Sequence, residues 1–159
     1  MPGGSSERRH RGEWFDPGNV SRLRSAREIF DWNSRVICQG FTGKQGTFWA
    51  EKMRDYGTKI IGGVNPKRAG EQHMGLPVWA SAKEAAQSAA IDAAVMFIPP
   101  MGVKDAALDL IEAGVKKIVC LTEHVPVHDT MYVLAAARER NCQVIGPNTA
   151  GIVTAAERN

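Results

Sequence analysis

From residue 35 onward, short apolar runs rich in β-branched residues alternate with longer segments whose apolar positions recur at helical spacing. Each of these runs predicts a strand, and they cover residues 36–40, 59–64, 93–98, 117–121 and 143–145. A further short run, 76–79, fits either a minor strand or a turn. Strands that alternate with helices through short connections predict parallel βαβ units. We therefore expect an α/β domain, Rossmann-like and doubly wound, with a mostly parallel five-stranded sheet flanked by helices.

The segments between these runs carry the signals that begin and end helices. The first, 47–56, is followed by a glycine that suits a left-handed C-cap. The second begins with Ser81 and Glu84, a capping box in which the glutamate is expected to bind the Ser81 backbone amide. The third and fourth, 103–113 and 130–140, carry apolar faces. These faces are expected to contain Ala107, Leu108 and Ile111 in the third helix and Val133, Leu134 and Ala137 in the fourth.

Composition limits the kinds of partner and compartment. The 159 residues suffice for one domain with a sizeable core, and the formal net charge of +3 is too small to predict a nucleic-acid binder. No apolar stretch approaches the roughly 20 residues of a membrane span. Three cysteines, two of them within apolar runs, predict a reducing compartment, either the cytoplasm or the mitochondrial matrix. We expect a flexible N-terminal arm at 1–34, the domain at 35–153 and a tail at 154–159.

Three glycines, Gly40, Gly43 and Gly46, follow the first predicted strand and enclose Lys44. Glycines allow a tight turn and close approach of a ligand to the backbone, and the helix that follows presents unpaired amides. Such a loop suits a phosphate. The Walker A pattern does not fit, because Cys38 occupies the position of its first glycine and the residue after Lys44 is neither serine nor threonine.

The stretch after the second predicted strand narrows the choice of ligand. A site for NAD would place an acidic residue here, to bind the ribose hydroxyls. The sequence instead reads GGVNPKR over residues 62–68 and ends in Lys67 and Arg68. Two cations favour a ligand with a further phosphate near its ribose. NADP and coenzyme A (CoA) both carry one, and these residues alone do not separate the two.

Six segments occur in an order that resembles one known family: VICQGFTGKQGTF, YGTKIIGGVNPKRAG, HMGLPVW, VMFIPP, CLTEHVP and VIGPNTAGIV. They resemble the N-terminal, CoA-binding domain of the α subunit of succinate–CoA ligase (succinyl-CoA synthetase), over about residues 34–153. The resemblance implies CoA as the cofactor. The sequence departs from the family pattern with Trp49 in place of histidine, Lys67 and His124 in place of glycines, and Thr149-Ala150 in place of Cys-Pro.

The resemblance also implies a CoA site on four loops. It places Gly40, Thr42, Gly43, Lys44, Gln45 and Gly46 around the CoA phosphates, Arg68 at the nucleotide end, Ile98 and Pro99 along the ligand groove, and Leu121, Thr122 and Glu123 after the fourth strand. The planar fork of donors on Arg68 suits the 3′-phosphate of CoA. No catalytic residue and no metal ligand is assigned in this chain.

The function that the resemblance implies is that of an acid–thiol ligase, ADP- or GDP-forming, as in the tricarboxylic acid cycle. Such a ligase joins a carboxylate to CoA through a phosphorylated histidine. In the family, the histidine belongs to a second, C-terminal α domain and a β subunit binds the nucleotide. We therefore expect CoA, a β subunit and that second domain as partners, and no activity from these residues alone. A stand-alone CoA-binding or regulatory module without catalysis is an alternative, and an NADP-binding Rossmann domain is a third.

Overall fold

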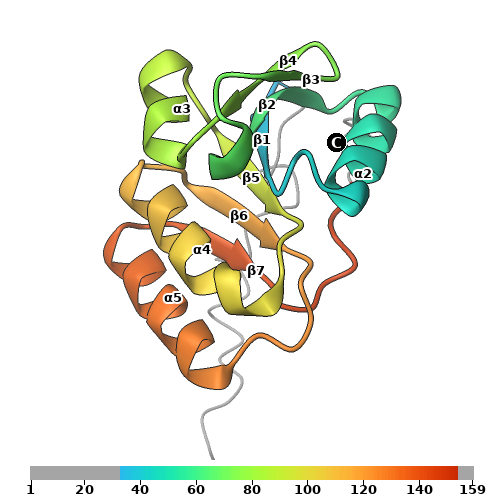
Figure 1. Ribbon diagram of the computed structural model, residues 1–159. Coiled ribbons are helices and arrows are strands. Elements are labelled where there is room, and N and C mark those ends of the chain that lie inside the picture. Colours follow the sequence, from blue (N-terminus) through green and yellow to red (C-terminus); the bar gives the residue numbers. More distant parts are fainter. Residues whose placement is uncertain (1–32, 154–159) are drawn as a thin grey trace, which may run out of the picture.

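The computed structural model describes residues 33–153, which form a seven-stranded sheet with helices on both faces (Figure 1). The predicted α/β class, doubly wound and mostly parallel, is confirmed. The sheet has two strands more than the five expected. The predicted tail at 154–159, and the predicted arm up to residue 32, lie outside the described residues.

The strand order in the sheet is β3-β4-β2-β1-β5-β6-β7, and every neighbouring pair is parallel except β3 with β4. The strands are β1 (Arg35–Gln39), β2 (Lys59–Val64), β3 (Gln72–His73), β4 (Leu76–Trp79), β5 (Ala93–Met96), β6 (Lys117–Cys120) and β7 (Gln143–Ile145). The helices are α2 (Lys44–Tyr56), α3 (Ala82–Ser88), α4 (Val103–Glu112) and α5 (Val127–Glu139), with 3-10 turns η2 (Pro66–Arg68) and η3 (Pro100–Gly102).

The two additional strands form a hairpin at one edge of the sheet. Met74 and Gly75 connect β3 to β4, with φ angles of 54° and 74°. Two consecutive positive φ angles define the tight turn that matches the twist of antiparallel strands. The β4 strand in turn pairs with β2 in parallel. The run 76–79 is therefore a strand rather than a turn.

Each face of the sheet has its own apolar core, because the central strands are buried on both sides. Ile37 of β1 belongs to the core that α3, α4 and α5 cover. The adjacent Cys38 belongs to the core on the opposite face, to which α2 contributes Ala50. Helix α2 packs mainly against β1 and β2. None of the helices within residues 33–153 is both long and apolar enough to span a bilayer.

The capping box of α3 differs in one bond from the prediction. Ser81 Oγ accepts from the Glu84 backbone amide at 3.1 Å, as predicted. The Glu84 carboxylate, however, accepts from the amide of Ala80 at 2.8 Å rather than from that of Ser81. Because a carboxylate on the first turn reaches back over the cap, it can satisfy whichever amide the entering chain turns toward it.

The apolar faces of the last two helices differ slightly from those expected. In α4 the buried residues include Leu110, whereas Leu108 is half-buried. In α5, Val133 and Ala137 are buried and Leu134 is half-buried. A helix that packs against both a sheet and a neighbouring helix buries a stripe of its surface. The periodicity of the sequence predicts that such a stripe exists but not which residues lie at its centre and which at its margin.

Candidate functional site

All the residues assigned to the site from sequence lie at the carboxyl edge of the parallel strands. Gly40, Thr42 and Gly43 follow β1, Arg68 ends the turn after β2, Ile98 and Pro99 follow β5, and Leu121, Thr122 and Glu123 follow β6. Lys44, Gln45 and Gly46 are the first three residues of α2. In open α/β sheets, ligands bind beyond this edge, where the strand order reverses, and here it reverses at β1.

The glycine loop folds tightly against the loop after β5. Gly40 has a φ of +77°, and a Cβ built there would lie 2.5 Å from the carbonyl oxygen of Phe97. A Cβ built on Gly46 would lie 2.2 Å from the carbonyl oxygen of Gly40. Only glycine fits at these two positions, since the backbones themselves are in contact.

This packing fixes the first residue of α2 and the backbone amides that are exposed at its N-terminus. The helix begins at Lys44, three residues before the predicted start, because Gly46 can enter the first turn only where a side chain is absent. The first bond from a backbone amide into the helix is from Thr47 to the Gly43 oxygen, at 2.8 Å. The backbone amides of Lys44, Gln45 and Gly46 therefore make no hydrogen bond within the helix. They lie at its N-terminus, where the helix dipole is positive.

Asn65, which the sequence did not single out, joins the first two loops of the site. Its side-chain amide donates to the hydroxyl of Thr42. Its side-chain oxygen accepts from the amide of Lys67 at 3.0 Å and so caps the 3-10 turn. The hydroxyl of Thr42 still has a proton to donate. The signal that would have found Asn65 is the Asn-Pro pair, which is typical of turn starts.

Arg68 is held by Glu71, a second residue that the sequence reasoning missed. Their closest contact is 2.7 Å, from Nη2 to Oε2, and both side chains are about half-exposed. The pair uses only Nε and Nη2, so an anionic ligand at Arg68 either replaces this carboxylate or binds the remaining N–H groups of the guanidinium. Exposed pairs of this kind are worth only about 0–1 kcal/mol, so the replacement is easy.

Thr122 ties the loops on the other side of β1 together. Its hydroxyl donates to the carbonyl oxygen of Ile98 at 2.8 Å, and its own carbonyl accepts from the amide of Asn148 at 2.9 Å. The adjacent His124 has a φ of 59°, a conformation that favours glycine. Its side chain is 82% exposed and therefore extends into solvent.

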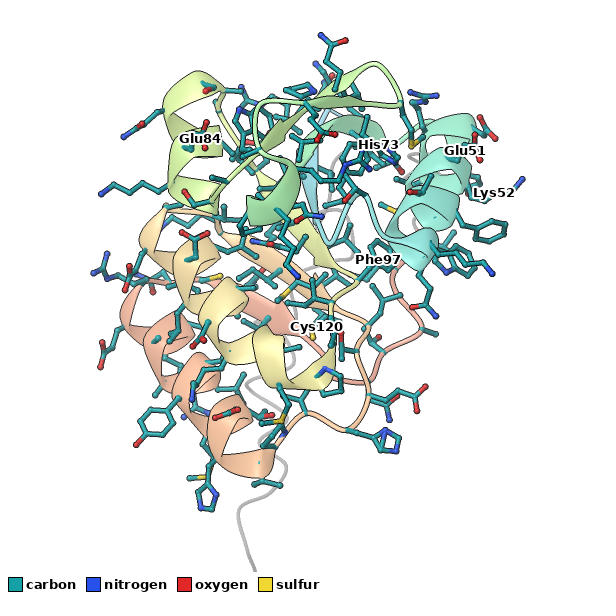
Figure 2. The ribbon with its side chains drawn as sticks, viewed as in Figure 1. Glu51, Lys52, His73, Glu84, Phe97 and Cys120 are labelled. Atoms are coloured by element: carbon teal, nitrogen blue, oxygen red, sulfur yellow. The ribbon has the colours of Figure 1, made fainter. Side chains whose placement is uncertain are left out.

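His73 of β3 braces the glycine loop (Figure 2). Its Nε2 lies 2.8 Å from the hydroxyl of Thr47, and its ring stands edge-on to Phe41 with centroids 5.0 Å apart. The Thr47 hydroxyl donates to the Phe41 carbonyl oxygen at 3.3 Å, so the imidazole supplies the proton for the other bond. The sequence did not decide whether residues 76–79 form a strand or a turn. The hairpin that contains them thus supports the loop that precedes α2.

Two buried residues at the end of β1, Cys38 and Gln39, immediately precede the glycine loop. Burial raises the pKa of the Cys38 thiol to about 12, so it is not a nucleophile at neutral pH. Gln39 is 4% exposed, and its side-chain nitrogen has no hydrogen-bond partner among the described residues. A buried amide without a partner is costly, and alternation along β1 places the Gln39 side chain on the sheet face of Ile37, opposite α2. The described residues contain no cluster of side chains suited to a metal ion.

Comparisons with known proteins agree on one kind of domain. The model of the CoA binding domain family matches residues 31–124. The chain is 43% identical over 126 residues to "Succinate--CoA ligase [ADP-forming] subunit alpha 2" of Archaeoglobus fulgidus, a match that covers 79% of this chain and 44% of that relative. It is 41% identical over 129 residues to a subunit of an ADP-forming sulfoacetate-CoA ligase of Acholeplasma sp, covering 81% and 44%. The chain thus spans less than half the length of these relatives.

Solved structures show the same fold at lower identity. The apo form of a dinucleotide-forming acetyl-coenzyme A synthetase 1 from Ca. Korarchaeum cryptofilum matches with a TM-score of 0.70 and 23% identity, over 83% of this chain and 30% of that one. The ATP citrate lyase of Methanothrix soehngenii, in complex with citrate and coenzyme A, matches with a TM-score of 0.68 and 22% identity, over 77% and 22%.

Proposed function

The chain belongs to the CoA-binding domain family, and from that premise we propose that it supplies the CoA-binding part of an acid–thiol ligase of the succinate–CoA ligase type. Coenzyme A is its cofactor. In the proposed pose, the CoA pyrophosphate lies at the amides of Lys44, Gln45 and Gly46, with Thr42 as a further donor. Helix termini bind phosphates in this way because unpaired amides and the helix dipole act together.

The observation that carries this pose is the contact between the glycine loop and the loop after β5. The backbone of Gly40 touches that of Phe97, which leaves the start of α2 as an open, positive edge beside the central strand. A phosphate-bearing ligand would satisfy the amides at the start of α2, since it brings acceptor oxygens to donors that otherwise lack them.

In the proposed pose the remaining loops bind the other parts of CoA. We place the 3′-phosphate at Arg68, because that residue follows β2, which in this fold runs beside the ribose of a bound nucleotide. We place the chain that carries the thiol along Ile98 and Pro99 and along Leu121, Thr122 and Glu123. In this pose Thr122 acts through its bond to Ile98, which holds the two loops at a fixed separation.

The carboxylate that such a ligase joins to CoA is proposed only as a class. Relatives of this chain are named for succinate, sulfoacetate and malate, each a small acid with a second anionic group. We propose an acid of this class, with ATP or GTP cleavage and the phosphorylated histidine in other parts of the enzyme and nucleotide binding in a β subunit. The described residues assigned to the site are suited to binding rather than to phosphoryl transfer.

Calorimetry of the full 159-residue chain tests the proposed ligand. CoA should bind, dephospho-CoA should bind more weakly, and NAD should give no signal. Lys44→Ala should weaken CoA binding, whereas Lys52→Ala, two turns further along α2, is the matched control and should leave it unchanged. Binding should weaken with added salt, because phosphate contacts are partly electrostatic. NADP binding without CoA binding would contradict the proposal.

A stand-alone CoA-binding module is the second candidate function. A conserved hypothetical protein from Pyrococcus furiosus matches with a TM-score of 0.56 over 70% of this chain and 91% of its own, so the fold also occurs as nearly a whole chain. Both candidates predict that these residues are not themselves phosphorylated. Incubation with labelled ATP or GTP, followed by analysis for acid-labile phosphate, tests this expectation. Phosphate on His73 or His124 would contradict it.

A further inference from the structure

Asn65 lies between the two loops that are proposed to bind the phosphates of CoA. It directly follows β2 and is half-buried. Its backbone amide donates to the carbonyl oxygen of Trp79 at 3.0 Å, and its own carbonyl oxygen accepts from the amide of Arg68 at 3.0 Å. Both of its backbone groups are therefore bonded, which fixes the direction in which its side chain leaves the backbone.

The side-chain amide of Asn65 can bind here in only one orientation. The backbone amide of Lys67 is a donor, so the side-chain atom that faces it at 3.0 Å must be the oxygen, Oδ1. The nitrogen, Nδ2, then faces the hydroxyl of Thr42. Because this nitrogen only donates, the Thr42 oxygen accepts, and its single proton is left for another acceptor. Asn65 thus keeps the Thr42 hydroxyl available as a donor.

The two loops that this bond joins meet different ends of the ligand in the proposed pose. Thr42 stands two residues before the start of α2, where we place the pyrophosphate, and Arg68 ends the turn that Asn65 caps, where we place the 3′-phosphate. We propose that Asn65 is a positioning residue for CoA, which fixes the Thr42 hydroxyl as a donor to the pyrophosphate. This role rests on the proposed function, since it requires a phosphate at Thr42.

The bond to Thr42 can be removed without separating the two loops. The amide of Gly40 donates to the carbonyl oxygen of Val64 at 3.2 Å, which joins the ends of β1 and β2 through the backbone alone. A serine hydroxyl also accepts from the amide two residues on, but it lies one bond closer to the backbone and so falls short of Thr42. Asn65→Ser therefore keeps the cap on the amide of Lys67 and loses the bond to Thr42.

Calorimetry of the full 159-residue chain with CoA and dephospho-CoA tests this role. Asn65→Ser should weaken the binding of both ligands by a similar factor, about three- to tenfold, because both carry the pyrophosphate that Thr42 meets. Thr42→Val should weaken both by at least as much, and adding Asn65→Ser to it should cause no further loss. Thr130→Val is the matched control, because it removes a hydroxyl that bonds within α5, and it should leave binding unchanged.

Asn65→Asp reverses the bond to Thr42 and gives a second measurement. The carboxylate keeps the size of the side chain and the cap, but it only accepts, so the Thr42 hydroxyl turns its proton toward it and away from the ligand. The loss of affinity should therefore exceed that of Asn65→Ser. In combination with Thr42→Val, Asn65→Asp should cost only the effect of its added charge. A loss no greater than that of Asn65→Ser would contradict the reversal.

Three results would overturn this role of Asn65 and leave the proposed function standing. The first is an unchanged affinity in Asn65→Ser. The second is a loss confined to CoA, because it would show that Asn65 acts through the turn of Arg68. The third is a double variant in which the losses from Asn65→Ser and Thr42→Val simply add. Failure of the unsubstituted chain to bind CoA would overturn the proposed function, and the role of Asn65 with it.

Discussion

The guanidinium of Arg68 is held by Glu71, with Nε and Nη2 2.8 and 2.7 Å from the same carboxylate oxygen. Both residues belong to the loop after β2, where the sequence predicts the contact with the 3′-phosphate. A phosphate there either exchanges places with the Glu71 carboxylate or binds the remaining N–H groups of the guanidinium. The fork of donors on Arg68 is thus already oriented, since the same N–H groups that bind a carboxylate bind a phosphate.

Arg68→Ala should weaken CoA binding and leave dephospho-CoA binding almost unchanged. A hydrogen bond to a charged group contributes about 1.5–3 kcal/mol, which corresponds to a loss of roughly 10- to 150-fold in affinity. Calorimetry with the two ligands checks this. Equal losses for both would mean that Arg68 meets the pyrophosphate instead, and no loss for either would leave Arg68 as a surface charge.

Glu71→Gln should strengthen CoA binding, because it removes the charge that competes with the phosphate and keeps the shape of the side chain. An exposed ion pair contributes about 0.2–1 kcal/mol, so the gain should be no more than about fivefold. The affinity for dephospho-CoA, which lacks the 3′-phosphate, should not change. A weaker affinity for CoA would show that Glu71 orients Arg68 more than it competes with the ligand.

Gly40→Ala should destabilise the domain and lower its affinity for CoA by about tenfold or more, since the added Cβ pushes the Phe97 loop away from α2. Gly114→Ala is the matched control. Gly114 also has a positive φ, +88°, but its Cβ would meet nothing within 4 Å. The control should therefore lose only the roughly 1–2 kcal/mol of the left-handed backbone. Urea unfolding and calorimetry give the two quantities. Equal destabilisation would rule out a role for the contact with Phe97.

His124→Gly should stabilise the chain. His124 adopts a φ of 59° with an exposed side chain, so glycine relieves backbone strain without removing packing. The gain should be about 0.5–1 kcal/mol, because the greater freedom of glycine in the unfolded chain offsets part of the relief. His124→Ala keeps the strained backbone and should give no gain. Thermal unfolding of the three proteins checks this, and a gain in both variants would point to the imidazole rather than to the backbone.

Asp92→Asn should destabilise the domain at neutral pH, and the difference should close in acid. The Arg35 guanidinium donates to both carboxylate oxygens, at 2.8 and 3.0 Å, and this hydrogen bonding holds the pKa of Asp92 below its ordinary value. A lowered pKa contributes stability that is present above the unfolded pKa of about 3.9 and is lost as the pH falls through the folded value. Urea unfolding from pH 7 to pH 2.5 measures the gap. A constant gap would mean that the amide disturbs geometry rather than charge.

The sequence by itself determined the order of the elements and the position of the site. Apolar runs separated by helical segments are local patterns, and they predicted β2 and β7 with the bounds that the structure gives. The glycines after β1 marked the point where a strand turns into a helix. Because parallel strands bring their carboxyl ends to one edge, the residues after four strands had to meet.

Only the tertiary structure decided how those residues are paired. Asn65 binds Thr42, Thr122 binds Ile98, and each bond joins residues more than 20 positions apart. Periodicity fixes which residues follow a strand, but the direction of each side chain depends on how neighbouring loops settle against one another. Even the nearby pair of Arg68 and Glu71 depends on the 3-10 turn between β2 and β3.

Only the tertiary structure likewise decides which half of a sheet face lacks a covering helix. The sequence shows that β5 and β6 are apolar enough to be buried on both faces. It does not show on which face each helix lies, because that depends on the side of the sheet on which each crossover passes. Within residues 33–153 the chain crosses between the faces once, after β4, and then keeps α3, α4 and α5 together. A groove beside α2, lined by residues of β5 and β6, is the consequence of that arrangement.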